Sequence, residues 1–135
     1  MAELLRVLRE WLLFFFVGDR YRIVHSQVGP SFDDALIEFA SNTLRWRLMQ
    51  DRSQILLSCR PAEGKHKDWD WYSADMLIRL ITGQRLDSAV LTQDMATWFE
   101  ENLSEIEQRF SGERREQTTG ELKKLEALRA KELFG

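Results

Sequence analysis

The sequence predicts an α+β domain with an N-terminal helix, an antiparallel meander of about four strands, and three C-terminal helices packed on one sheet face. Two patterns support this prediction. Apolar residues alternate with polar ones through much of residues 20–61, as strands require, and they recur at helical spacing before and after that stretch. Because helices and strands are segregated along the chain, we expect no parallel sheet and no nucleotide site of the kind found at its switch point.

Residues 2–17 are predicted to form the first helix, because apolar residues recur at helical spacing from Leu4 to Phe15. Residues 11–17 form an unbroken apolar run, so we expect the end of this helix to be buried on several sides and to stop at Gly18. The run is too short to span a bilayer, which needs about 20 residues. Attachment to a membrane interface and burial in a homodimer are alternatives for this helix.

Four segments carry the period-two alternation of strands, each with one mostly apolar face. Short polar turns separate them, which favours antiparallel neighbours. One face of the sheet should contact helices, and the other should be partly exposed to water. The predicted strands are residues 21–25, 35–40, 44–49 and 54–59.

Three helices are predicted in the rest of the chain. The first covers about 73–83, and the second covers about 92–110 with the clearest amphipathic stripe of the sequence. The last covers about 113–133 and has only a narrow apolar stripe, so it packs on the core, protrudes into solvent or contacts a partner. A chain of 135 residues fits one domain, and we treat 1–135 as a single unit.

The sequence offers little that resembles a catalytic site. It has no Gly-rich phosphate loop, no Walker-type lysine and no Gly-x-Ser-x-Gly elbow. Cys59 and His25 would form a nucleophile and base if the fold joined them, but a buried cysteine and a locally packed histidine are the simpler interpretation. We therefore expect no enzyme activity, no catalytic residue and no cofactor.

A metal site is not expected either. His66, Asp68 and Asp70 are spaced two residues apart, which points extended side chains to one side and would suit a divalent cation. Lys65 and Lys67 lie between them and oppose a cation, so a solvated loop is the preferred interpretation.

One candidate partner-binding segment lies just after this loop. It interleaves aromatic rings with carboxylates, and Trp and Tyr are typical of binding hot spots. A partner with a basic surface would complement the carboxylates. The alternative is that the rings pack under the loop and lead into the next helix. The residues are Asp68, Trp69, Asp70, Trp71 and Tyr72.

Two further surfaces are candidates. The polar face of the 92–110 helix crowds Glu100, Glu101, Glu105 and Glu107, which repel one another and would attract a basic partner. The alternative is an ordinary solvated face.

On the sheet, arginines occupy the polar side of one strand and the end of the next. This placement suits binding of anions or nucleic acid, although pairing with Glu38 is the simpler account. These arginines are Arg45, Arg47 and Arg60.

Net charge argues against a general nucleic-acid binder, because the chain carries −3 and residues 61–111 hold ten acidic and five basic residues. The single cysteine, Cys59, favours a reducing, cytoplasmic compartment. The pattern is typical of small bacterial proteins, and no residue motif ties the chain to a family.

The leading hypothesis is therefore a non-catalytic protein-interaction module, such as an inhibitor, an immunity-type protein against a toxin, or an adaptor. The first alternative is a ligand-binding or enzymatic domain with a pocket between sheet and helices, using His25, Cys59 or Arg45. The second alternative is nucleic-acid binding through the arginine-bearing sheet face. We expect a protein partner, with a homodimer as a variant, and no membrane span.

Overall fold

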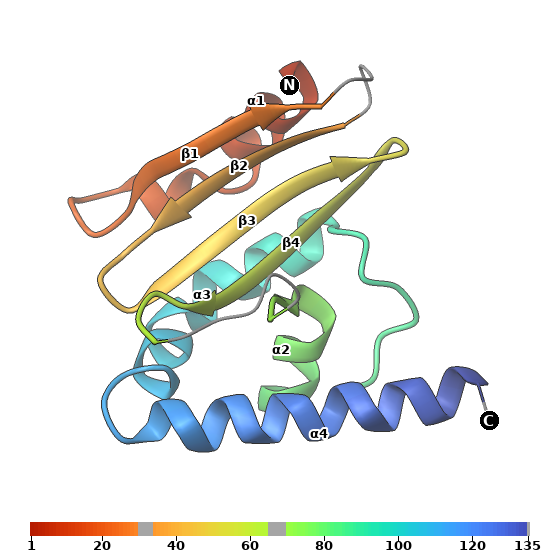
Figure 1. The fold of residues 1–135 in the computed structure, drawn as a ribbon. Helices are drawn as coiled ribbons and strands as arrows, with labels where there is room; N and C mark the ends of the chain where they lie inside the picture. The colour runs from red at the N-terminus through yellow and green to blue at the C-terminus, as the bar shows by residue number, and fades with distance from the viewer. Residues whose placement is uncertain (30–33, 65–69, 135) are drawn as a thin grey trace.

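A computed structural model describes residues 1–29, 34–64 and 70–134 of the chain, and it confirms the α+β class. The sheet is an antiparallel meander whose strands follow one another in chain order, with a fifth short strand that the sequence pattern did not predict (Figure 1). The strands are β1 (Arg22–Val28), β2 (Ala35–Ala40), β3 (Leu44–Asp51), β4 (Gln54–Pro61) and β5 (Tyr72–Ser73).

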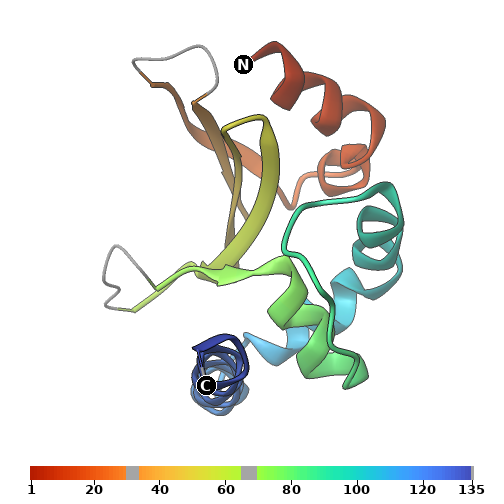
Figure 2. The same ribbon diagram turned by 90° about the vertical axis from the view of Figure 1, so that its right-hand side faces the viewer.

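The helices lie on one face of the sheet and at one of its edges. Figure 2 shows the sheet edge-on with α1 and α3 on the same side, while none of the described helices lies over the opposite face. The last helix, α4, packs against α2 and α3. The helical elements are α1 (Ala2–Glu10), the 3₁₀ helix η1 (Leu13–Phe16), α2 (Ala74–Thr82), α3 (Gln93–Arg109) and α4 (Arg114–Phe134).

The alternation of β2, β3 and β4 places their buried residues toward the helices. Phe39 pairs with Trp46, and Trp46 pairs with Cys59, so these three side chains lie in one row across the inner face and are fully buried. β1 differs, because every one of its residues is exposed and its register shifts between Ile23 and His25. β1 is therefore an open edge strand that carries a β-bulge.

The prediction of one continuous helix over 2–17 was wrong, because α1 ends at Glu10 and the chain continues as η1. This tighter turn inserts Phe15 among rings of the core, with ring centroids 4.8 Å from Phe39 and 5.1 Å from Trp46. Burial of this ring outweighs the modest helix preference of the apolar run. The end of the run is not buried on all sides, since Val17 is 77% exposed.

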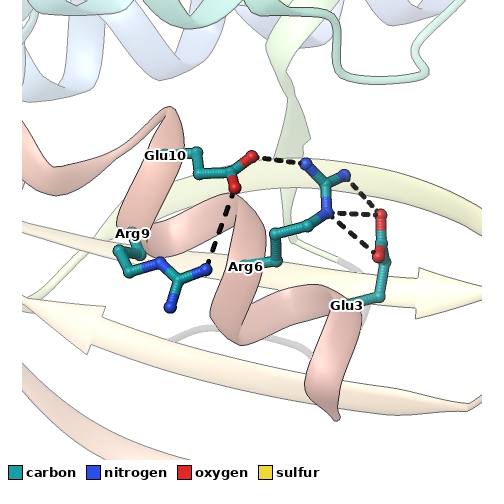
Figure 3. Close-up of polar contacts among 4 residues, drawn as sticks. All are labelled: Glu3, Arg6, Arg9 and Glu10. Carbon is teal, nitrogen blue, oxygen red and sulfur yellow. Dashed lines mark hydrogen bonds and ion pairs between the residues drawn. The ribbon is translucent and has the colours of Figure 1, made fainter.

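The solvent-facing side of α1 is organised by ion pairs (Figure 3). Arg6 lies between two carboxylates, each about one turn away from it: its Nη1 donates to Glu10 at 2.7 Å, and its Nε donates to Glu3 at 3.1 Å. The hydrogen bond from Arg6 lowers the pKa of Glu3. Pairs of this kind on the surface add little stability, but they hold the Arg6 guanidinium 5.6 Å from the Trp11 ring centroid.

The boundaries predicted for the C-terminal helices are confirmed. Ser73 and Gly83 flank α2, and Gly83 adopts a left-handed φ of 76°, which a glycine permits without strain. Thr92 caps α3, because its side chain accepts a hydrogen bond from the Met95 amide at 3.2 Å. α4 buries only Thr118 and Leu122, so much of this helix faces solvent.

Candidate functional site

The uncovered face of the sheet carries a cluster of basic residues, which we call the basic face. Residues that pair across an antiparallel sheet point to the same side. The register places Ala40 opposite Arg22 and Arg45, and Arg45 opposite Arg60, in one row that points away from the helices. In the next row Glu38 pairs with Arg47. The basic face consists of Arg22, Glu38, Arg45, Arg47, Arg60 and Trp71.

Trp71 connects two of the surfaces predicted from the sequence. The guanidinium carbon of Arg47 lies 4.5 Å from the centroid of the Trp71 ring, and that of Arg60 lies 4.3 Å from it. Such cation–π contacts are worth roughly 0.5–1 kcal/mol at exposed sites and more where water is excluded. All three side chains are half-buried, so the stack is a preformed feature of the surface rather than a set of free side chains.

The basic face has more guanidinium groups than carboxylates to pair with them. Arg45 bonds Glu38 at 2.6 Å, as predicted for cross-strand pairing. Arg22, Arg47 and Arg60 have no ion pair with any described residue. Burial lowers the pKa of Arg47, Glu38 raises it, and the neighbouring charge of Arg60 lowers it again.

Arg47 also leaves hydrogen-bonding capacity unused. Its Nε is buried and has no hydrogen-bond partner among the described residues. Buried donors are normally satisfied, so an unused donor in a guanidinium marks a group that gains from an added acceptor. An incoming carboxylate would supply both charge and acceptors to the guanidinium.

The residues of the 68–72 segment lie in different environments. Asp68 and Trp69 lie outside the described residues. Tyr72 is only 4% exposed and pairs with Cys59 on the inner face, so it belongs to the core rather than to a binding surface. Asp70 already interacts with another residue. Trp71 is thus the described member of this segment that presents its ring to a surface cluster.

The acidic helix face is only partly as predicted. Glu100, Glu101 and Glu105 are exposed, and Glu105 lies 3.9 Å from the Arg109 Nε as an ion pair. Glu107 was wrongly placed with them, because it is 8% exposed and points into a polar network. Its position one turn after Leu103 and before Phe110 puts it at the margin of the apolar stripe, which is a signal the sequence contains.

The candidate nucleophile, Cys59, and the candidate base, His25, do not lie close together. Cys59 is fully buried on the inner face, whereas His25 pairs with Glu38 on the outer face of another strand. Burial raises the pKa of the Cys59 thiol, which disfavours the reactive thiolate. Of the three residues considered as metal ligands, His66 and Asp68 lie outside the described residues, and the described residues contain no group of three side chains that could hold a metal ion.

A second feature is a polar cavity of about 710 Å³ at one end of the sheet, and its lining contains none of the residues that the sequence suggested for a pocket, His25, Cys59 and Arg45. Its walls come from the segment before β1, the turn between β2 and β3, and the C-terminal half of α3. The lining residues are Asp19, Arg20, Arg22, Val24, Ala40, Ser41, Asn42, Thr43, Ser104, Glu107, Gln108 and Ser111.

A buried hydrogen-bond network holds two of the lining residues, Ser41 and Glu107, in place. The Trp46 Nε1 donates to the Tyr21 hydroxyl at 3.1 Å, and Tyr21 donates to the Oε1 of Glu107. Ser41 donates to the same oxygen at 3.0 Å, while its own Oγ accepts from the Leu44 amide at 3.1 Å. Burial raises the pKa of Tyr21, and the Glu107 carboxylate raises it further, so the hydroxyl stays a donor.

Neither feature can be interpreted through a relative. The chain matches no family model, no curated protein and no solved structure. None of the described helices is long and apolar enough to cross a membrane.

Proposed function

We propose that this protein is a non-catalytic protein-interaction module that binds an acidic surface of its partner through the basic face. The observation that carries the proposal is the Trp71 ring held against Arg47 and Arg60 on a sheet face that no described helix covers. Trp and Arg are the residue types most enriched in binding hot spots. Because the stack is already formed, binding would order few additional side chains.

The charge pattern supports an acidic partner. Three guanidinium groups of the basic face lack an ion pair with the described residues. A carboxylate that reaches Arg47 or Arg60 would form a charge-assisted hydrogen bond at a partly desolvated site. The basic partner predicted for Glu100, Glu101 and Glu105 is a separate expectation, since those residues lie on α3 and not on the basic face.

A protein partner is preferred over nucleic acid. Single-stranded nucleic acids bind to sheet faces on which several aromatic rings stack with bases. The strand positions that form the outer rows carry no Phe, Tyr or Trp, and Trp71 is already engaged by two guanidinium groups. The net charge of −3 also opposes association with a polyanion.

An inhibitor, an immunity-type protein or an adaptor would each use a preformed face in this way. A bacterial origin and a cytoplasmic location belong to the same proposal, and the single cysteine supports the location because a reducing compartment preserves a free thiol.

The test compares two double variants of equal charge change as baits in lysate from the native host. Arg47→Gln with Arg60→Gln removes two positive charges from the basic face, and Arg9→Gln with Lys124→Gln removes two from exposed positions of α1 and α4 as the matched control. Circular dichroism first establishes that both variants fold.

The proposal requires one protein that the wild type and the control retain and the basic-face variant loses. The purified pair should then bind more weakly in the Arg47→Gln, Arg60→Gln variant by about 2 kcal/mol, or roughly thirtyfold in Kd, and more weakly at high salt. Retention of the partner by the basic-face variant would refute the assignment of the face. Recovery of nucleic acid instead of protein would favour the alternative function.

A further inference from the structure

We propose that the polar cavity at the end of the sheet binds a small zwitterion, a molecule with one ammonium and one anionic group such as a free α-amino acid. The cavity is lined by the residues before and at the start of β1, by the turn between β2 and β3, and by the end of α3. It shares Arg22 with the basic face, but the protein-binding proposal rests on Arg47, Arg60 and Trp71. The inference therefore goes beyond the proposed function and does not depend on it.

The size and lining of the polar cavity suit a small polar molecule. Ligand cavities of roughly 300–1,000 Å³ are typical of small-molecule sites, and this one measures about 710 Å³. Val24 and Ala40 are its apolar lining residues, so a large hydrophobic ligand would gain little there. The side chains of Asn42, Ser104 and Gln108 supply neutral donors and acceptors around it.

The anionic end of the ligand would meet two arginines. Arg20 and Arg22 flank the buried Tyr21 and both line the polar cavity. Neither has an ion pair with a described residue. A guanidinium presents parallel donors that match the two oxygens of a carboxylate, so an anion of this class would satisfy them best.

The ammonium end would meet Glu107. One carboxylate oxygen of Glu107, Oε1, accepts hydrogen bonds from Tyr21 and Ser41, but Oε2 accepts none from the described residues. Glu107 is 8% exposed as a residue, but Oε2 is not one of the described buried atoms that lack a partner, so a donor in the cavity can reach this oxygen. An ammonium group would supply both a donor and the opposite charge, while the network from Trp46 through Tyr21 holds the carboxylate in place.

The balance of charges selects among ligand classes. Arg20 and Arg22 are matched in the lining by Asp19 and Glu107. A polyphosphate or dicarboxylate would place negative charge against Glu107, and a polyamine would place positive charge against the arginines. A neutral polyol would leave both kinds of charged group without a partner. A molecule with one charge of each sign is the class that satisfies both walls.

The test titrates the full-length, ¹⁵N-labelled protein with the standard amino acids singly, at millimolar concentration, and follows the backbone amide signals by NMR. We expect at least one amino acid to shift the signals of Ser41, Asn42, Ser104 and Gln108 in a saturable way. For that amino acid, the matched amine without the carboxylate and the matched acid without the ammonium should each bind about tenfold more weakly or not at all.

Three variants separate this site from a structural role. Arg20→Ala with Arg22→Ala removes the anion-binding wall from exposed positions and should weaken binding about tenfold or more, while Arg9→Ala with Lys124→Ala, at exposed positions of α1 and α4, is the matched control with no expected effect. Glu107→Gln keeps the acceptor for Tyr21 and Ser41 but removes the charge, and should abolish preference for the zwitterion.

The proposal is overturned if no amino acid shifts the signals of the cavity, if the amine or acid binds as well as the zwitterion, or if Arg20→Ala with Arg22→Ala leaves the Kd unchanged. If Glu107→Gln fails to fold, the Arg20→Ala, Arg22→Ala variant still tests the proposal. Arg47→Gln with Arg60→Gln is expected to keep amino-acid binding, so failure of the basic face and failure of the polar cavity are distinguishable.

Discussion

The indole of Trp46 donates a hydrogen bond of 3.1 Å to the hydroxyl of Tyr21, which itself donates to Glu107. This hydroxyl links β3, the segment before β1 and α3 in the interior. Tyr21→Phe removes it and leaves the indole N–H and the carboxylate each short of one partner. We expect the variant to lose about 2 kcal/mol in free energy of unfolding, measured by urea denaturation.

The matched control is Tyr72→Phe. Tyr72 is as buried as Tyr21, but its hydroxyl makes no hydrogen bond to a described residue, so this change should cost clearly less. An equal loss in both variants would show that the network contributes no more than the ring packing does.

The attachment of α4 relies on a buried carboxylate. Asp75, at the start of α2, is 1% exposed and accepts hydrogen bonds from Ser73 and from Arg129 of α4. Arg129→Ala leaves this carboxylate without its counter-charge, and we expect a loss of about 1–3 kcal/mol, because the arginine itself is partly exposed. Faster amide hydrogen exchange in α4 should accompany the loss. Lys131→Ala, at an exposed neighbouring position, should leave both quantities unchanged.

A pair of leucines on α4 tests how much of the helix belongs to the core. Leu122 is fully buried, whereas Leu128 is 44% exposed on the same helix. We expect Leu122→Ala to lower the free energy of unfolding by about 2–4 kcal/mol and Leu128→Ala to change it by less than about 1 kcal/mol. Similar effects at both positions in denaturant titrations would contradict the packing described for this helix.

The stability of the protein should fall in alkaline solution. Burial raises the pKa of the Cys59 thiol, and it raises the pKa of Tyr72 to about 12. In the unfolded chain these groups lose their protons near 8.5 and 10, so above those values the unfolded state binds fewer protons than the folded state. The free energy of unfolding should therefore be constant near neutral pH and decline from about pH 8.5 upward.

Urea denaturation at a series of pH values checks this decline. Cys59→Ala should delay the onset of the decline to about pH 10, where tyrosine begins to titrate. Cys59 should also react with a thiol reagent only after unfolding. A flat pH profile, or rapid labelling of the native thiol, would rule out the buried neutral thiol.

Much of the fold follows from local patterns. The alternation in β2, β3 and β4 predicts which face is apolar, because a sheet with one covered face needs that period. The caps Thr92 and Gly83 predict the limits of two helices for equally local reasons. In contrast, β5 has only two residues, which is too short for a detectable alternation. It forms because it pairs with the edge of β4.

The surfaces were harder to predict because they depend on contacts between distant residues. Arg47 and Arg60 were recognised as one group and Trp71 as another, but their stacking requires β5 to pair with β4, which brings Trp71 beside Arg60. The polar cavity depends on Glu107 being buried, and a glutamate beside three exposed glutamates gives little indication of that. Only its position at the margin of the apolar stripe distinguishes it.

The basic face and the exposed glutamates of α3 lie on opposite sides of the sheet (Figure 2). These two groups of charges together contribute an electric dipole directed across the sheet, with its positive end on the uncovered side. A field of this kind turns a small protein during diffusion, so that its first contacts with a charged partner occur in the productive orientation. Encounter rates would then depend on ionic strength even where the final affinity does not.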